Sequence, residues 1–331
     1  MFLYLKKNIS RNSNNYFYKM DIKYFEDIAE FKEYAMNNDI SNIIVKFGNL
    51  TSNTLVNNID IFKKIQKLDC SYTNITNILK ELVNLQYLNC SQTQIKEIPK
   101  ELINLRSLIC SYTKITEIPI SFVNLQELYC YDTKITKMPK ELINISILYC
   151  YNTNITEIPI SFVNLTFLDC SDTKIIEIPK ELIKLRTLNC SWTQITEIPI
   201  SFVNLQQLYC YDTKITEIPK ELINLTFLKC RNTSIKEIPK ELINLQGLYC
   251  SGTRIIEIPK ELNKLQELSC RETLVKQIPV TLDLLEHINS DFITLSEHKA
   301  NVLKYKNEIK DIIKNGNVLN DDVNNLICYY I

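Results

Sequence analysis

Hydrophobic positions along this chain repeat with a period of 20 residues. Each copy carries the same frame, which in one copy reads Leu85-x-x-Leu88-x-Cys90-x-x-Thr93-x-Ile95-x-x-Ile98-Pro99-x-x-Leu102. The cysteine of this frame forms a ladder without a slip, at Cys70, Cys90, Cys110, Cys130, Cys150, Cys170, Cys190, Cys210, Cys230, Cys250 and Cys270. A fixed period of this kind means that one supersecondary unit is copied along the chain.

Each copy predicts a short strand followed by a return leg that is not an α-helix. Leu88 and Cys90 alternate with more polar or aromatic residues, which is the period-two pattern of a strand with one buried face. Pro99 has no backbone N–H, so a helix cannot pass through it. The roughly six residues that follow are too few for an ordinary helix, and the return leg is expected to be a 3₁₀ turn or extended.

Strands one copy apart are expected to stack in parallel, about 4.8 Å from each other. A single copy buries too little apolar surface to offset the entropy lost in ordering its backbone, so only the stack folds. The frame resembles the leucine-rich repeat over residues 65–295, with Cys at the third apolar position and Thr where most relatives place Asn. The resemblance implies a right-handed α/β-type solenoid. Such a leucine-rich-repeat horseshoe has a parallel β-sheet on its concave face, short 3₁₀ or extended return legs, and helical caps.

The short unit with its Ile-Pro pair is similar to the 20-residue repeats of bacterial effector proteins. It is also similar to those of uncharacterised leucine-rich-repeat proteins of large DNA viruses of amoebae. The composition is rich in Asn, Ile and Lys, which favours the viral group.

Three regions are expected along the chain. Residues 1–60 form a helical N-terminal cap, with an amphipathic helix around Tyr24–Met36 and a strand at Ile43–Phe47 that fits a degenerate first repeat. Residues 61–295 hold eleven regular copies and a degenerate last one, and residues 296–331 form a helical C-terminal cap and tail. Atypical end units are expected because a stack must cover the apolar surface of its first and last turns.

Charge and composition argue against several kinds of partner. The chain has 38 basic and 38 acidic side chains, so no net field steers it onto nucleic acid or an anionic membrane. No stretch approaches the roughly 18 to 20 apolar residues of a membrane span, and the apolar run at the start is too short for a signal peptide. We therefore expect a cytoplasmic protein with reduced thiols, in the host-cell cytoplasm if it is viral.

The recurrent Cys, Thr and Asn side chains are interpreted as structural. Thiols in a line, without a Cys-x-x-Cys pair, do not converge on a zinc ion. Their parallel spacing also lies outside that of a disulfide, whereas a buried free cysteine packs as a small hydrophobe. The series that starts at Thr73 is expected to bond backbone groups of the turn, and the series from Asn84 to do similar work on the other edge. No metal and no cofactor is expected.

Catalysis has little support. The two histidines, His287 and His298, lie in the C-terminal cap region without a nucleophile–base arrangement. Four glycines are too few for the P-loop and dinucleotide-binding fingerprints. Glu97, Glu117 and their equivalents fit a solvated charged edge. The sequence therefore indicates neither an enzyme nor a small-molecule substrate.

A longer period of 40 residues lies over the first. Ile-Pro-Ile-Ser-Phe-Val-Asn-Leu alternates with Ile-Pro-Lys-Glu-Leu-Ile-Asn-Leu, so that Ile120, Ile160 and Ile200 stand where the alternate copies carry Lys. The favoured interpretation is that these isoleucines lie on the Phe and Val of a neighbouring turn. The alternative is a row of exposed apolar spots on the convex side, which would be a second contact surface.

The informative positions are the outward-facing strand residues, because they vary inside the fixed frame. Four tyrosines, at positions 129, 131, 149 and 151, are expected to form a two-by-two block on adjacent strands. Tyr, Trp and Arg dominate binding hot spots. The candidate partner-binding residues are Tyr129, Tyr131, Tyr149, Tyr151, Phe167, Trp192, Tyr209, Tyr211, Phe227, Arg231, Tyr249 and Arg271. They predict a scaffold that binds a protein partner on the concave face, whereas the competing interpretation is that strand aromatics only shield their neighbours.

A second function class is a substrate adaptor or component of a ubiquitin ligase, as some bacterial relatives are. Those enzymes add a large helical catalytic domain with a nucleophilic cysteine, whereas here Cys328 has no identifiable base. An F-box-like segment at Tyr24–Met36 lacks the expected Leu-Pro opening. A nucleic-acid binder would need a basic stripe, but the concave positions mix acidic and basic residues.

Overall fold

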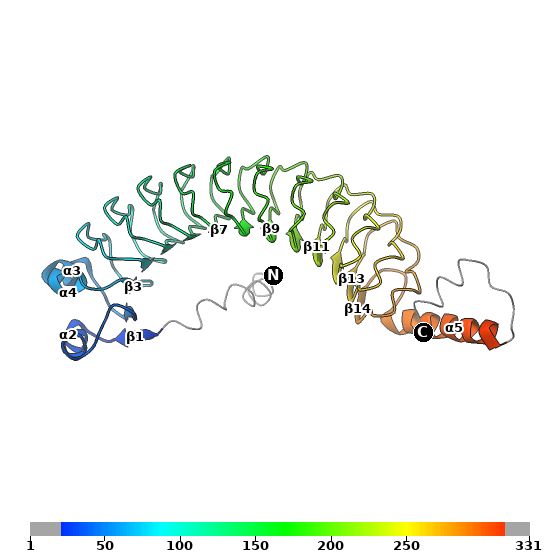
Figure 1. Cartoon of the computed structure of the whole chain (residues 1–331), viewed down its shortest axis with the longest axis horizontal. Coiled ribbons are helices and arrows are strands. Elements are labelled where there is room, and N and C mark those ends of the chain that lie inside the picture. Colours follow the sequence, from blue (N-terminus) through cyan, green and yellow to red (C-terminus); the bar gives the residue numbers. More distant parts are fainter. Residues whose placement is uncertain (1–20, 315–331) are drawn as a thin grey trace. The chain divides into compact units, whose positions relative to one another are not determined.

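The structure is a computed structural model that describes residues 21–314, with side-chain surroundings given for residues 21–310. Two compact units divide the chain, residues 1–194 and residues 195–331. In each unit short strands run side by side along one side, and the legs that connect them lie on the other (Figure 1). The strands of each unit follow chain order, and their pairing is parallel.

The first unit begins with a cap of mixed structure, which holds β1 (Ile22–Phe25), α2 (Ile28–Asn37), β2 (Ile44–Phe47), α3 (Ser52–Asn57) and α4 (Ile59–Phe62). Its repeat strands are β3 (Lys67–Asp69), β4 (Tyr87–Asn89), β5 (Ser107–Ile109), β6 (Glu127–Tyr129), β7 (Ile147–Tyr149), β8 (Phe167–Asp169) and β9 (Thr187–Asn189). The second unit holds β10 (Gln207–Tyr209), β11 (Phe227–Lys229), β12 (Gly247–Tyr249), β13 (Glu267–Ser269), β14 (His287–Asn289) and α5 (Leu295–Lys314).

The repeat frame folds as its pattern predicts. Leu88 pairs with Leu108 on the next strand, and Leu88 and Cys90 are fully buried. The Cys90 amide donates to the carbonyl of Ile109 at 2.8 Å, so each turn is bonded to the next through its backbone. All eleven ladder cysteines are buried and free. The fold class predicted from the sequence, a parallel β-solenoid, is confirmed.

The return legs are built from tight turns. In one leg the amide of Leu102 donates to the carbonyl of Pro99 at 3.2 Å, and the amide of Leu105 donates to the carbonyl of Leu102 at 3.2 Å. Such i→i+3 bonds are those of a 3₁₀ turn. None of the described legs between β3 and β14 contains an α-helix, which confirms the expectation drawn from the proline.

Thr side chains hold one edge of the regular turns, and Asn side chains hold the other edge in most of them. The Thr93 hydroxyl donates to the carbonyl of Cys90 at 2.7 Å, and the same bond recurs at Thr73, Thr113, Thr133, Thr153, Thr173, Thr193, Thr213, Thr233, Thr253 and Thr273. On the other edge the Asn104 amide donates to the carbonyl of Val83, 2.9 Å away in the preceding turn. Both series are structural, as predicted.

The N-terminal cap differs from the expected single helix. Tyr24 belongs to β1, and α2 begins only at Ile28. The reason is Asp27, whose carboxylate accepts the amides of Ala29 and Glu30 and so caps the helix after the strand has ended. Phe25 and the aromatic residues of α2 therefore share a helical spacing in the sequence without sharing a helix.

The C-terminal cap covers the last repeat of the second unit. Ser290 replaces the ladder cysteine, and its hydroxyl donates to the carbonyl of Ile293 at 2.6 Å. The ring Nε2 of His298, a buried residue on α5, lies 2.9 Å from the carbonyl of Leu282. The described helices include none with the length and apolar character needed to cross a membrane.

Candidate functional site

The strand face is the surface made by the outward-pointing strand residues and the two residues after each ladder cysteine. Strands of a parallel sheet lie about 4.8 Å apart, which is close to the separation of stacked aromatic rings. Aromatic residues at the same position of consecutive turns are therefore held in stacks by the sheet itself. The residues of the strand face that the sequence singled out fall on both units, and each unit has its own arrangement.

In the first unit the four tyrosines form two stacked pairs. The rings of Tyr129 and Tyr149 lie 4.9 Å apart at 13°, and those of Tyr131 and Tyr151 lie 4.3 Å apart at 9°. Phe167 extends the first stack, with its ring 4.4 Å from that of Tyr149. These five rings make a continuous aromatic surface over β6, β7 and β8.

Stacking covers part of this aromatic surface. Tyr149, between two rings, is only 6% exposed, while Tyr129, Tyr131 and Tyr151 are half-buried. Burial raises the pKa of Tyr129 and Tyr151, and neighbouring phenol and carboxylate groups raise it further. The phenols therefore stay neutral at physiological pH and can donate hydrogen bonds. Tyr149 therefore contributes more to the stack than to the exposed surface, while its part in binding stays a prediction.

A second set of aromatic residues stands at the edge of the strand face, and only Trp192 among them was predicted as a binding residue. Tyr72, Tyr112 and Trp192 have φ of 61°, 55° and 55°, in the left-handed region, and are exposed. Bulky residues are outliers in that region. The Tyr112 ring meets the ring of Tyr131 edge-on at 5.4 Å, so it belongs to the aromatic surface. The signal that could have found the set is an aromatic residue two places after the ladder cysteine.

In the second unit an ammonium group is inserted between aromatic rings. Lys229 Nζ lies 5.2 Å from the ring centre of Tyr209 and 4.8 Å from that of Tyr249, a cation–π arrangement. Burial lowers the pKa of Lys229, and the nearby Glu267 carboxylate opposes this effect. The Tyr249 hydroxyl donates to the carboxylate of Glu267. Lys229 was not among the predicted residues.

The remaining predicted residues of the second unit are spread over its strand face. The rings of Tyr209 and Tyr211 meet edge-on at 6.5 Å. Phe227 lies over Gly247, where a Cβ would stand 2.6 Å from the phenylalanine ring. The Phe227 ring thus fills the space that a side chain at position 247 would take.

The two predicted arginines are both exposed. Arg271 Nε lies 2.8 Å from Asp291 Oδ1, in an exposed ion pair, while Arg231 stands two turns earlier at the same position. The predicted residues of the second unit thus include both aromatic and basic side chains, whereas those of the first unit are all aromatic.

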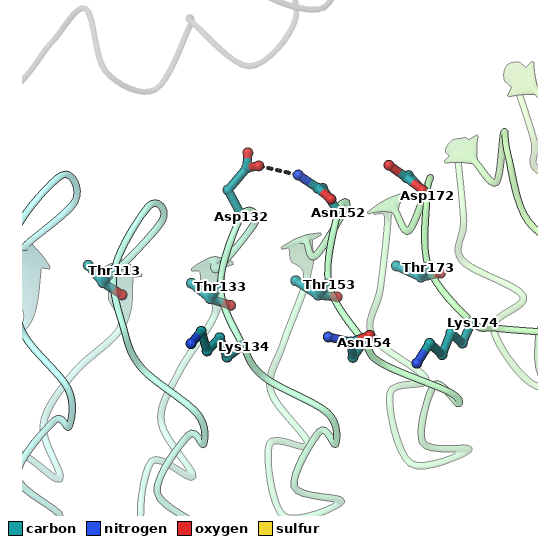
Figure 2. A pocket seen from close by; sticks show the side chains of 10 residues that line it. All are labelled: Thr113, Asp132, Thr133, Lys134, Asn152, Thr153, Asn154, Asp172, Thr173 and Lys174. Atoms are coloured by element: carbon teal, nitrogen blue, oxygen red, sulfur yellow. Dashed lines mark hydrogen bonds between the residues drawn. The ribbon is translucent and has the colours of Figure 1, made fainter.

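A polar groove of about 470 Å³ runs along the turn edge of the first unit (Figure 2). Asp132, Asn152 and Asp172 stand on its side nearest the strands, and the Asn152 amide donates to the carboxylate of Asp132. Lys134 and Lys174 stand on its other side. The threonines between the two rims donate their hydroxyl hydrogens to the ladder carbonyls, so toward a ligand they can only accept hydrogen bonds.

The favoured interpretation of the alternate isoleucines is wrong. Ile120, Ile160 and Ile200 are 66%, 69% and 67% exposed, so they do not lie under neighbouring side chains. The turn after each proline points this position away from the protein, whether it holds Ile or Lys. These residues form exposed apolar spots on the return legs of their units.

Ile160→Lys is expected to leave the stability of the protein unchanged within about 0.5 kcal/mol, because an exposed side chain is exchanged for the one found in alternate turns. A chemical denaturation curve measures this. The matched core change Ile158→Lys, at a buried position two residues away, is expected to abolish the cooperative transition. A large loss of stability for Ile160→Lys would mean that this side chain is covered after all.

The described residues hold no cluster of three or more His, Cys, Asp or Glu side chains that could bind a metal ion. Within that part of the chain the two histidines lie apart, with His287 in β14 and His298 on α5. Cys328, considered above as a catalytic candidate, lies outside the described residues.

Solved structures that resemble the chain include leucine-rich-repeat proteins. A leucine-rich-repeat protein of Leptospira interrogans is 23% identical over 81% of this chain and 88% of its own, with a TM-score of 0.62. The functional domain of InlJ from Listeria monocytogenes, which includes a cysteine ladder, is 23% identical over 76% of this chain and 66% of its own, with a TM-score of 0.63. The fold is the leucine-rich-repeat fold.

Among structures with the leucine-rich-repeat fold, the plant peptide hormone receptor RGFR1 in complex with RGF2 is also similar. It is 22% identical over 78% of this chain, with a TM-score of 0.57, and the match spans 51% of the receptor chain. No protein-family model and no curated protein sequence matches the chain. At these identities the likeness establishes the leucine-rich-repeat fold and leaves the function to be argued from the surface.

Proposed function

We propose that this protein is a non-enzymatic scaffold that holds a protein partner on its strand face. The observation that carries the proposal is the aromatic surface of the first unit, where two stacked tyrosine pairs and Tyr112 stand on the side that the repeat frame leaves free to vary. Rigid aromatic rings with neutral hydroxyls bind proteins at low entropic cost. The aromatic and basic residues of the second unit provide a separate contact area.

Known structures with this fold support the proposal. RGFR1 was solved with RGF2, and the ectodomain of GASSHO1/SCHENGEN3 from Arabidopsis thaliana with CASPARIAN STRIP INTEGRITY FACTOR 2. The fold is thus compatible with holding a peptide or protein ligand. The adaptor alternative gains nothing from the N-terminal cap, because Phe25 and Phe31 fill its interior and are not available to a ligase subunit.

We also propose that the protein works in a reducing compartment such as the cytoplasm. Its ladder thiols are free in every described repeat. A viral origin, and with it the host-cell cytoplasm, is supported by the Asn-, Ile- and Lys-rich composition.

The test is to replace four tyrosines by alanine, namely Tyr129, Tyr131, Tyr149 and Tyr151. Loss of central aromatic anchors is expected to weaken partner capture from a host lysate by more than about tenfold, while the circular-dichroism melt shifts by only a few degrees. Capture is quantified by mass spectrometry against the unaltered protein. Unchanged capture by the quadruple variant would overturn the proposal.

The matched control carries alanine at four exposed return-leg positions, namely Ile103, Ile143, Val163 and Ile183. It removes a comparable number of exposed apolar side chains from the opposite side of the same unit. The control is expected to capture the same proteins as the unaltered chain. Equal losses in the two variants would point to general stickiness instead of a strand-face site.

A further inference from the structure

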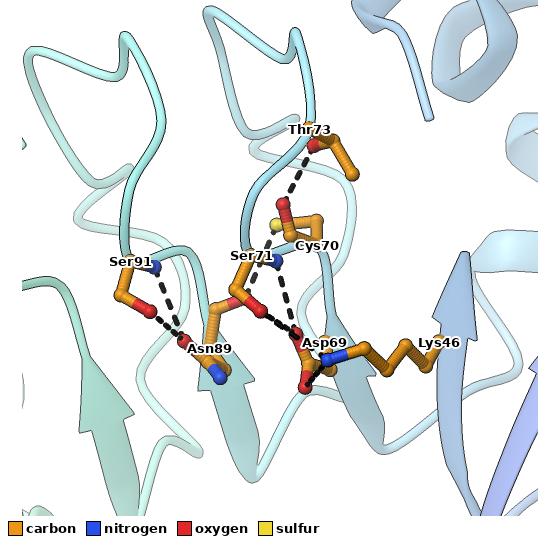
Figure 3. Close-up of polar contacts among 7 residues, drawn as sticks. All are labelled: Lys46, Asp69, Cys70, Ser71, Thr73, Asn89 and Ser91. Atoms are coloured by element: carbon orange, nitrogen blue, oxygen red, sulfur yellow. Dashed lines mark hydrogen bonds and ion pairs between the residues drawn. The ribbon is translucent and has the colours of Figure 1, made fainter. Parts of the chain in front are cut away.

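The same three-residue segment, Asp-Cys-Ser, occurs in two turns of the first unit with different electrostatic surroundings. At Asp69 the side chain of Lys46 supplies a positive charge that pairs with the carboxylate (Figure 3). Lys46, from β2, places its Nζ 2.9 Å from Asp69 Oδ2 and 3.4 Å from the Ser71 hydroxyl. The carboxylate is buried, and its charge is balanced by an ammonium on the neighbouring strand.

At Asp169 an amide takes the place of the ammonium. Asn189 Nδ2 lies 3.1 Å from Asp169 Oδ2 and 3.3 Å from the Ser171 hydroxyl, in the role that Lys46 has at the first segment. The Ser171 hydroxyl and amide both donate to Asp169 Oδ1. The carboxylate is therefore hydrogen-bonded, but among the described residues no basic side chain pairs with it.

This unbalanced carboxylate is deeply placed, since Asp169 is only 3% exposed. Burial raises its pKa, and its bonds to Ser171 and Asn189 only partly oppose that effect. A buried charge without a counter-charge destabilises the fold. This carboxylate lies directly beside the aromatic surface, because Asp169 on β8 is the register partner of Tyr149 on β7.

The surrounding strand face is acidic as well. Glu127, Asp132 and Asp172 stand on the same turns as the aromatic residues or on the next one. From β5 to the turn after β9, the outward strand positions and the two residues after each cysteine include no Lys or Arg. Lys134 and Lys174 lie across the groove, beyond the acidic rim (Figure 2). The charged side chains at the strand-face positions of this unit from β5 onward are therefore all acidic, although the whole chain is neutral.

We propose that the partner segment held by the strand face of the first unit is basic and inserts an arginine beside Tyr151, between Asp169 and Asp172. The inference rests on the proposed function and names the chemistry of its partner. Tyr151 stacks on Tyr131 on one side, and on its other side the next turn offers only the small Ser171. A planar guanidinium suits this position, because it can lie flat on an aromatic ring and donate two parallel hydrogen bonds to one carboxylate, whereas an ammonium is a point charge without that geometry.

The probe is a fluorescent synthetic peptide of Gly, Ser and Arg, together with a twin in which every Arg is replaced by citrulline. Citrulline keeps the planar shape and loses the charge. Fluorescence anisotropy with the full chain is expected to show binding of the Arg peptide, at least about tenfold weaker binding of the twin, and weaker binding as salt is raised. A Lys peptide is expected to bind less tightly than the Arg peptide.

The variants are Asp169→Asn and Asp172→Asn, alone and together. The double variant is expected to bind the Arg peptide about tenfold more weakly. Asp169→Asn is also expected to shift the melting temperature by only a few degrees, because the removal of a buried charge is offset by the loss of the bond that Asp169 Oδ2 accepts from Asn189 Nδ2. Should Asp169→Asn fail to fold, Asp172→Asn and the citrulline twin still decide the question. The charge-matched control, Glu157→Gln with Glu177→Gln on the exposed return legs, is expected to bind as the unaltered chain does.

Three results would overturn the inference, namely no binding of the Arg peptide at low salt, equal binding of the citrulline twin, or equal losses in the Asp variants and the Glu control. The proposed function fails separately. Capture from a lysate could depend on the four tyrosines but be unaffected by salt and by substitution of both aspartates. That result would support the scaffold function and refute only the inference that the partner is basic. If peptide binding depends on the aspartates but capture does not depend on the tyrosines, the strand face binds arginine, and the proposed function of the aromatic surface is refuted.

Discussion

Iodoacetamide at neutral pH is expected to leave the ladder cysteines of the native protein unlabelled for hours. Burial raises the pKa of Cys110, Cys190 and Cys230 to about 12. Only the thiolate reacts, so a rise of about three units lowers the reactive fraction about a thousandfold, before access is considered. Cys270, with a pKa of about 11 near the end of the ladder, is expected to react first. Peptide mapping by mass spectrometry at timed intervals measures each site.

The control is the same reaction in guanidinium chloride, where all eleven ladder thiols are expected to react within minutes. Cys328 lies outside the described residues and is left out of the comparison. Fast native labelling of several ladder thiols would mean that the cysteines face water. The outward positions would then be the core, and the aromatic surface proposed as the binding site would not exist.

Phe162→Ala is expected to cost about 3 to 5 kcal/mol of unfolding free energy. Phe162 is fully buried in a return leg, and its removal leaves a cavity that the stiff turns on either side cannot close. Each turn is stable only through its neighbours, so a defect in one turn weakens the contacts on both sides. Urea denaturation followed by circular dichroism measures the loss.

Phe162→Leu is the matched control for the cavity. The flanking turns carry Leu142 and Leu182 at this position, so leucine is known to fit the local backbone. A loss of about 1 kcal/mol is expected, because only part of the volume disappears. Similar losses for the alanine and leucine variants would show that the ring, and not the filled volume, stabilises the leg.

The aromatic surface illustrates how far the sequence leads toward the site. The 20-residue register places Tyr129 and Tyr149 at the same position of adjacent turns, so their proximity could be predicted. Their exposure could not, because it depends on which rings stand on either side. Phe167 closes over Tyr149, whereas Tyr151 meets only Ser171 on that side. The difference arises from residues 20 apart in the chain, and a single-copy pattern does not contain it.

Two further features depend on the backbone and on neighbouring strands, and residue type alone does not predict them. Tyr112 and Trp192 are held in the left-handed region because every turn bends at that point, whatever residue it carries. Asp69 and Asp169 lie in identical Asp-Cys-Ser segments, yet one carboxylate meets Lys46 and the other meets Asn189. Lys46 lies in the degenerate first strand, 23 residues before Asp69, so the 20-residue period alone does not align the two.

By itself, the sequence determined the architecture of the leucine-rich-repeat solenoid: which side chains are buried, where each leg turns, and why the chain must stack to fold. These properties repeat, and their cause lies within 20 residues, where alternation, proline and hydrogen-bonding side chains act locally. Only the tertiary structure decided which outward residues remain accessible and which charges stay unbalanced. Accessibility and charge balance are set by neighbours on adjoining strands, through contacts that a local pattern does not specify.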